Sequence, residues 1–200
     1  MQEIDFFKTP FFLFKSDKKF AEKISDEIRD ILKNKKKVDY INYKGQWKNK
    51  IKVNIPHLNF ETYSTIGGFL DNKGDDINLE NMPSQIKNHL IENIQKIPLP
   101  LQIVELWANI TSSNDYNRVH NHCSQADLVF VLYLTKGTLW IQNPHYRLEL
   151  DRRYNSVGSS ISLDFNIGDM IVFPSDIQHW VEPFDGDYDR ISIAGNLSIN

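Results

Sequence analysis

The sequence predicts a mainly β protein with flanking helices, an α+β arrangement in a single domain of 200 residues. Three observations support this class. Apolar residues recur every three or four positions in two segments of the first half, which is the period of an amphipathic helix. From residue 101 onward they alternate instead, and β-branched and aromatic residues predominate. Eight or nine short candidate strands with glycine turns between them are typical of a barrel or a sandwich.

Two helices are expected in the part of the chain before residue 101, which we predict to be helical or irregular over about 1–100. The first can be capped by Ser16 or Asp17 and runs to about residue 32. The second lies within NMPSQIKNHLIENIQKI at 81–97, with its proline at a tolerated first-turn position. His89 falls beside the apolar stripe of this helix, so we expect it at the surface or boundary. Residues 38–66 predict only short strands or irregular structure.

The β core is expected over about 101–200, with the helices packed on its outside. The candidate strands are QIVELWANI, YNRVHNH, DLVFVLYL, GTLWIQN, RLELD, SSISLDF, DMIVFP, HWVEPF and RISIAGNLSI.

Charge and hydropathy exclude several classes of partner. The net charge of −3 argues against a nucleic-acid surface, because such surfaces carry a basic excess. No apolar run is long enough to cross a membrane, and the first residues do not resemble a secretory signal. A cytoplasmic protein is therefore expected. The lone Cys123 agrees with a reducing compartment. Its thiol is either a nucleophile or simply the side chain of a small residue at a strand end. The oligomeric state stays open, and a homodimer is compatible with the sequence.

His120 and His122 form an H-x-H pair. Side chains two residues apart on a strand leave from the same face, so both imidazoles can converge on one metal ion. A chain with six histidines also produces such a pair by accident, and two ordinary polar residues remain the alternative.

The dipeptide Asp185-Gly186 predicts a two-residue hairpin turn between apolar runs. In that register His179 lies opposite Ser192 and Val181 lies opposite Arg190. His179, Arg190 and Ser192 would then face the same space.

An inward-facing Arg190 needs an anion, because an unpaired buried guanidinium is costly. The anion is either a ligand carboxylate, which Arg190 and Ser192 can hold together, or a protein carboxylate such as Asp169 or Asp187.

The combined pattern resembles the 2-oxoglutarate- and iron(II)-dependent oxygenases, in particular a family of small bacterial and phage-type members. That family shows W-x-N, then H-x-H, a strand ending in Tyr-Tyr-Leu, G-x-x-x-x-F-P-S followed by a histidine, and R-I-S leading to an asparagine. The corresponding residues here are Trp107, Asn109, His120, His122, Leu132, Tyr133, Leu134, Gly168, Phe173, Pro174, Ser175, His179, Arg190, Ile191, Ser192 and Asn196. The early FFKTPFF is similar to the family's usual opening.

The resemblance implies a double-stranded β-helix, also called a jelly-roll or cupin-like core, with two main helices packed outside. It implies a non-haem oxygenase that uses Fe(II), 2-oxoglutarate and O₂, and couples decarboxylation of 2-oxoglutarate to succinate with oxidation of an unknown small molecule or protein side chain. The implied metal ligands and catalytic residues are His120, His122 and His179. The implied cosubstrate contacts are Arg190, Ser192, Tyr133 and Asn109.

The chain departs from the usual His-x-Asp motif of this superfamily, because His122 stands where the aspartate is expected. The ligand set is then three histidines, unless Asp127 takes the third position. A cupin-type metal protein that does not use 2-oxoglutarate is an alternative, with His120, His122, Asp127 and His179 as ligands. A non-catalytic β-barrel for binding or assembly is a second alternative.

Overall fold

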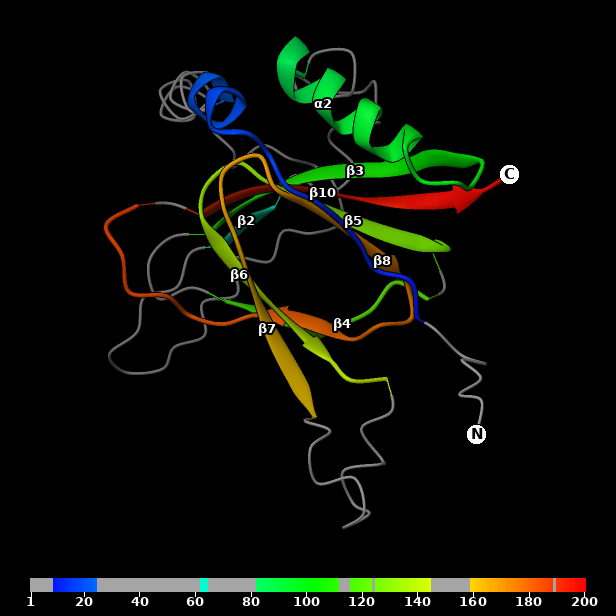
Figure 1. Ribbon diagram of the computed structural model, residues 1–200. Coiled ribbons are helices and arrows are strands. Elements are labelled where there is room, and N and C mark those ends of the chain that lie inside the picture. The colour runs from blue at the N-terminus through cyan, green and yellow to red at the C-terminus, as the bar shows by residue number, and fades with distance from the viewer. Residues whose placement is uncertain are drawn as a thin grey trace, which may run out of the picture.

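The computed structural model describes residues 9–24, 62–64, 82–111, 116–123, 125–144, 159–188 and 190–200. In this part of the chain the strands form two antiparallel sheets (Figure 1). The larger sheet has six strands in the order β1-β8-β5-β10-β3-β2, and the smaller has four in the order β4-β9-β6-β7. Their bounds are β1 Phe12–Phe14, β2 Thr62–Ser64, β3 Leu101–Thr111, β4 Asn117–His120, β5 Leu128–Tyr133, β6 Gly137–Gln142, β7 Ser160–Phe165, β8 Met170–Pro174, β9 His179–Val181 and β10 Arg190–Ile199.

The mainly β architecture with outer helices is confirmed. Each of β3 to β10 falls within or closely matches one candidate strand from the sequence. The candidate RLELD lies outside the described residues. β2 is one short strand inside the region 38–66, whereas β1 was not predicted; it pairs with the outer edge of β8. The division into a single domain with a boundary near residue 100 stays a prediction.

The predicted second helix is confirmed as α2, Ser84–Gln95. Pro83 is its N-cap rather than a first-turn residue. The helix buries Ile86, Leu90 and Ile94, and Figure 1 shows it across the outer face of the larger sheet. This covering explains why every residue of β5 is buried. One face of that strand packs toward the helix side and the other toward the smaller sheet, so the strand reads as a continuous apolar run.

The start of the predicted first helix is also confirmed. Residues 18–24 are helical, and the Asp17 carboxylate accepts a hydrogen bond from the Phe20 amide at 2.7 Å, as an N-cap should. The remainder of this helix lies outside the described residues. No helix of the described residues has the length and apolar character needed to cross a membrane.

His89 holds the helices against the β core. Its ring stacks on Phe20 with centroids 3.9 Å apart, and its Nε2 hydrogen-bonds with the Gly168 carbonyl at 2.9 Å. Gly168 has φ +83°, and a Cβ there would meet Ser16 at 2.8 Å. His89 is half-buried, as expected for a boundary residue, and it has a structural role.

The predicted hairpin between β9 and β10 is wrong. β9 pairs with β4 and β6 in the smaller sheet, whereas β10 pairs with β3 and β5 in the larger one. The segment after β9 therefore carries the chain from one sheet to the other. Asp185-Gly186 has the composition of a tight turn, but strand pairing across the fold decides the topology. His179 and Ser192 consequently lie on opposing sheets and are not cross-strand partners.

Candidate metal centre

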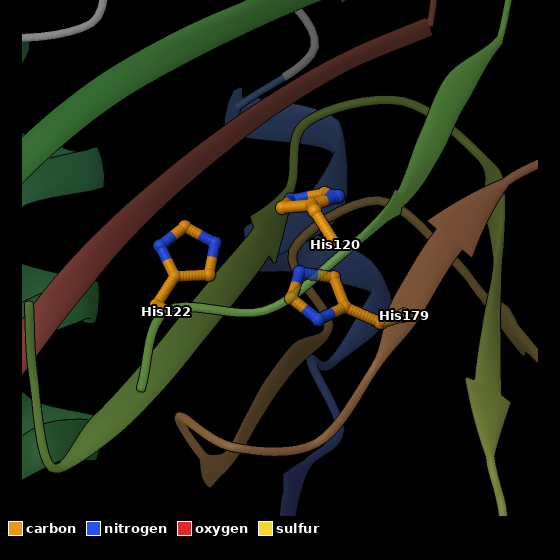
Figure 2. A group of neighbouring side chains, drawn as sticks. All are labelled: His120, His122 and His179. Atoms are coloured by element: carbon orange, nitrogen blue, oxygen red, sulfur yellow. The ribbon is translucent and has the colours of Figure 1, made fainter. Parts of the chain in front are cut away.

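Three histidines meet between the two sheets. His120 ends β4, His179 begins β9, and these two residues are cross-strand partners. His122 follows two residues after His120, beyond the end of the strand. One ligand nitrogen from each ring can be chosen so that all three lie within 4.8 Å of one another. Figure 2 shows the three rings directed toward a common space. The prediction that they converge is confirmed, although His122 converges from a coil segment and not from the strand.

The backbone fixes the outer nitrogen of two of these rings. His120 Nδ1 donates to the Arg118 carbonyl at 2.7 Å, and His179 Nδ1 donates to the Ile177 carbonyl at 3.0 Å. A carbonyl oxygen only accepts, so the proton of each neutral ring is on Nδ1. Each Nε2 then carries a lone pair, which is the form that binds a metal.

Burial keeps two of the rings neutral. Burial, together with the neighbouring His120, lowers the pKa of His179 to about 3, against the opposing effect of the hydrogen bond to Ile177. Burial likewise lowers the pKa of His122 to about 4, again with a contribution from His120. Neutral imidazole is the ligand that metals require, so these two rings are ready to bind at neutral pH. His120 is exposed and leaves the group accessible from its side.

The ring nitrogens of His122 are the clearest indication that a further group binds here. Both of its ring nitrogens are buried and have no hydrogen-bond partner among the described residues. The ring is 8% exposed and stacks on Trp107 with centroids 5.6 Å apart. Leaving buried polar atoms unsatisfied is costly, and a bound metal would satisfy one of the two. The three histidines therefore fit a metal ion, and imidazole suits iron, nickel, copper and zinc alike.

The wall facing the histidines is built by the larger sheet. Asn109, Ser192 and Tyr133 are Cα partners across β3, β10 and β5, so they form one row on the same face. All three line the same pocket as the histidines. Tyr133 Oη is buried with no hydrogen-bond partner among the described residues. Burial raises the pKa of Tyr133 and outweighs the opposite effect of Arg190, so the phenol remains a donor at neutral pH.

Arg190 lies two residues from Ser192 on β10 and is 8% exposed. Its Nη1 donates to the Glu182 carbonyl at 2.9 Å, and its guanidinium carbon lies 4.3 Å from the centroid of the Phe184 ring. Asp169, one of the two protein carboxylates considered for Arg190, forms an ion pair with Lys15 at 2.8 Å instead. Arg190 thus brings a positive charge to the pocket that His179 and Ser192 also line. These residues share the pocket although β9 and β10 do not form the predicted hairpin.

The remaining candidates lie away from the three rings. Asp127 is exposed, and its Oδ2 accepts a hydrogen bond from the Ile199 amide at 2.8 Å. It does not belong to the group of potential metal ligands, which disfavours its role as a ligand. Cys123 is free and exposed. His57 and His145 fall outside the described residues.

The sequence pattern of one family, described as putative 2OG-Fe(II) oxygenase, matches residues 105–196. That stretch includes all three histidines, Arg190 and the whole row Asn109, Ser192 and Tyr133. Most of the β core of this chain is therefore similar to the putative 2OG-Fe(II) oxygenase family. The early resemblance is thereby confirmed, and it is a resemblance to a family of enzymes.

Solved structures of oxygenases share the fold. HygX from Streptomyces hygroscopicus, with nickel and 2-oxoglutarate bound, is similar with a TM-score of 0.56 and 11% identity, over 94% of this chain and 82% of HygX. A Pseudomonas putida prolyl-4-hydroxylase has a TM-score of 0.56 and 14% identity, over 96% of this chain and 94% of that one. The α-ketoglutarate-dependent carbocyclase SnoK from nogalamycin biosynthesis has a TM-score of 0.56 and 10% identity, over 94% and 78%. No curated protein matches the chain. The predicted double-stranded β-helix fold is confirmed.

Proposed function

We propose that this oxygenase binds Fe(II) through His120, His122 and His179 and binds 2-oxoglutarate against Arg190, and that it oxidises a substrate that approaches from the exposed side of His120. The observation that carries the proposal is one pocket with two chemically different walls. Three imidazoles line one wall, and a row of hydrogen-bonding side chains next to a guanidinium lines the other. This pairing suits a ligand that is a metal chelator at one end and a carboxylate at the other.

Each residue of the carboxylate wall has a distinct task. The guanidinium of Arg190 neutralises the remote carboxylate of 2-oxoglutarate and can hold it with two parallel hydrogen bonds. The Ser192 hydroxyl and the Tyr133 phenol donate to the same carboxylate from the adjacent row. Asn109 closes this row and offers one more amide contact. Together these residues direct the keto-acid end toward the histidines, which is orientation gained before any chemistry begins.

The bound iron supplies the activation of O₂ that no amino-acid side chain can provide. In the overall reaction 2-oxoglutarate loses CO₂ and takes up one oxygen atom to become succinate. The other oxygen atom enters the substrate, for example as a hydroxyl group replacing a hydrogen. Three protein ligands leave positions open for the reactants, and the exposed edge at His120 is where they reach the centre. The apolar residues Val129, Val131 and Leu139 line the same pocket and limit access of water.

The test is aerobic conversion of 2-oxoglutarate with Fe(II), followed by NMR. We expect one succinate for each 2-oxoglutarate consumed, no reaction without Fe(II), and no reaction in His179→Ala. Arg190→Lys keeps the charge but loses the planar fork, so it should raise the KM for 2-oxoglutarate much more than it lowers kcat. Succinate formation that His179→Ala leaves unchanged would contradict the proposal.

A further inference from the structure

The connecting loop, residues 182–188, leads from β9 in the smaller sheet toward β10 in the larger one (Figure 1). It contains the Asp185-Gly186 dipeptide, which does not form the hairpin turn expected from the sequence. Instead the rings of Phe184 and Tyr188 pack against each other with centroids 5.2 Å apart. A Cβ at Gly186 would lie 3.0 Å from the Phe184 ring and 3.1 Å from the Tyr188 ring, so both rings pack closely on this glycine. The connecting loop therefore has a compact aromatic centre.

The connecting loop contacts the guanidinium of Arg190 through its backbone and through a ring. The Glu182 carbonyl accepts a hydrogen bond from Arg190 Nη1 at 2.9 Å, and the centroid of the Phe184 ring lies 4.3 Å from the guanidinium carbon. At that distance the ring and the guanidinium are in direct contact, and no water molecule fits between them. Phe184 is half-buried and Arg190 is buried, so the ring separates one face of the charged group from the solvent.

The pocket provides the other surroundings of Arg190. The stem of Arg190 passes Gly137, where a Cβ would lie 3.9 Å from Arg190 Cδ, and the residue lines the pocket together with Tyr133 and Ser192. With the Phe184 ring over one face, an anion from the pocket approaches along the plane of the guanidinium, where its N–H groups lie. This approach suits a planar carboxylate, which accepts parallel hydrogen bonds from such a group.

We propose that Phe184 is a positioning residue for cosubstrate binding: its ring holds the guanidinium of Arg190 in place and excludes water from the ion pair between Arg190 and the remote carboxylate of 2-oxoglutarate. A charge pair that is shielded from water attracts more strongly than an exposed pair and is screened less by salt. The face of an aromatic ring also stabilises a cation, so the ring makes the burial of Arg190 less costly before the carboxylate binds. The inference rests on the proposed function, in which Arg190 binds this carboxylate.

The salt dependence of 2-oxoglutarate binding tests this role. Calorimetric titration of the Co(II)-loaded protein gives the Kd for 2-oxoglutarate at about 50 mM and about 500 mM KCl, a range over which exposed charge pairs become screened. Phe184→Ala opens the guanidinium to water, so it should weaken binding by about 5- to 30-fold at the lower salt concentration. The Kd of this variant should also rise more steeply with salt than the Kd of wild type. Phe184→Tyr keeps the ring and should restore both the wild-type Kd and its salt dependence.

Two further measurements separate this role from a general loss of stability. Tyr188→Ala removes the exposed ring of the same loop, which packs on Phe184, and it should leave the Kd for 2-oxoglutarate and its salt dependence close to wild type. The Co(II) affinity should be the same in wild type and both alanine variants, because neither ring lines the pocket that holds the histidines.

Three results would overturn the proposal: a wild-type Kd and salt dependence in Phe184→Ala, an equal loss in Tyr188→Ala, or a matching loss of Co(II) affinity in Phe184→Ala. A wild-type protein that binds Co(II) but not 2-oxoglutarate would instead count against the proposed function, as would wild-type 2-oxoglutarate affinity in Arg190→Lys. These two results do not depend on Phe184, so the two failures can be told apart.

Discussion

His120 and His179 are cross-strand partners in the β4–β9 pair, and their ring centroids lie 4.3 Å apart. β9 is paired on its other side with β6, where Ile141 is the Cα partner of His179. Backbone pairing therefore holds these two imidazoles together, and their outer nitrogens are already bonded to carbonyls. Because these two rings are already held in place without the metal ion, we expect metal binding to change the sheet little.

His179→Ala is expected to abolish tight metal binding while the fold survives. Replacing one of three ligands removes a direct bond, and the loss in affinity should be at least the roughly 10- to 100-fold that follows loss of an outer-shell partner. His89→Ala is the matched control, because His89 is likewise a hydrogen-bonded histidine but packs between Phe20 and Gly168. It should lower the melting temperature and leave the Co(II) affinity as in wild type. Equal affinity losses in both variants would argue against the metal centre.

Tyr133→Phe should separate stability from cosubstrate binding. The Tyr133 hydroxyl is buried without a partner, so removing it relieves an unsatisfied group and should leave the free energy of unfolding equal or higher. If the hydroxyl donates to 2-oxoglutarate, its loss should weaken binding by about 2- to 10-fold, the effect of one hydrogen bond. Calorimetric titration of the metal-loaded protein measures this. An unchanged affinity would remove Tyr133 from the cosubstrate site.

Gly137→Ala should displace the ring of Tyr133, which lines the pocket. A Cβ at this position would lie 2.8 Å from the Tyr133 ring, which is stacked flat on Phe165 with centroids 4.4 Å apart and has little room to yield. We expect a loss of about 1 to 3 kcal/mol in unfolding free energy and a larger relative loss in 2-oxoglutarate affinity than in Co(II) affinity. Denaturant unfolding and the two titrations test this. Normal 2-oxoglutarate affinity in the variant would show that Tyr133 moves freely.

Asp169 should contribute stability that depends on pH. Burial raises the pKa of Asp169, but hydrogen bonds from Lys15, Asn166 and Ser16 outweigh burial and hold it below the ordinary value. Because the folded-state pKa is the lower one, the stabilisation is present above the unfolded pKa of about 3.9 and is lost as pH falls below it. Asp169→Asn should therefore be less stable than wild type at pH 7 by about 1 to 3 kcal/mol. The difference should shrink toward pH 3, and a gap independent of pH would contradict this origin.

Much of the β core can be predicted from the sequence because its signals are local. The alternation in GTLWIQN and the apolar run in DLVFVLYL correspond to β6 and β5. The H-x-H spacing and the later His179 identify the candidate ligands, although His122 lies past the strand end. A short coil follows β4 and carries His122. The prediction that His122 meets the other two rings is therefore right, although the assumption that it lies on a strand is not.

The errors arise where distant strands decide the outcome. Asp185-Gly186 predicts a hairpin locally, yet β9 and β10 belong to different sheets, because pairing with β4 and β6 on one side and with β3 and β5 on the other outweighs a two-residue turn. The bond between Asn196 and Glu105 was not anticipated for the same reason, since their partnership depends on the register of β10 with β3. The R-I-S motif leading to Asn196 marked the residue but not its partner.

The most direct test of the metal centre is anaerobic titration of the purified protein with Fe(II) and then 2-oxoglutarate. Chelation of the iron by the keto-acid end produces a visible charge-transfer band. We expect this band in wild type, saturating at about one iron per chain, and its absence in His179→Ala. A wild-type protein that shows no band at saturating concentrations of both, or a His179→Ala variant with an undiminished band, would contradict the three-histidine centre.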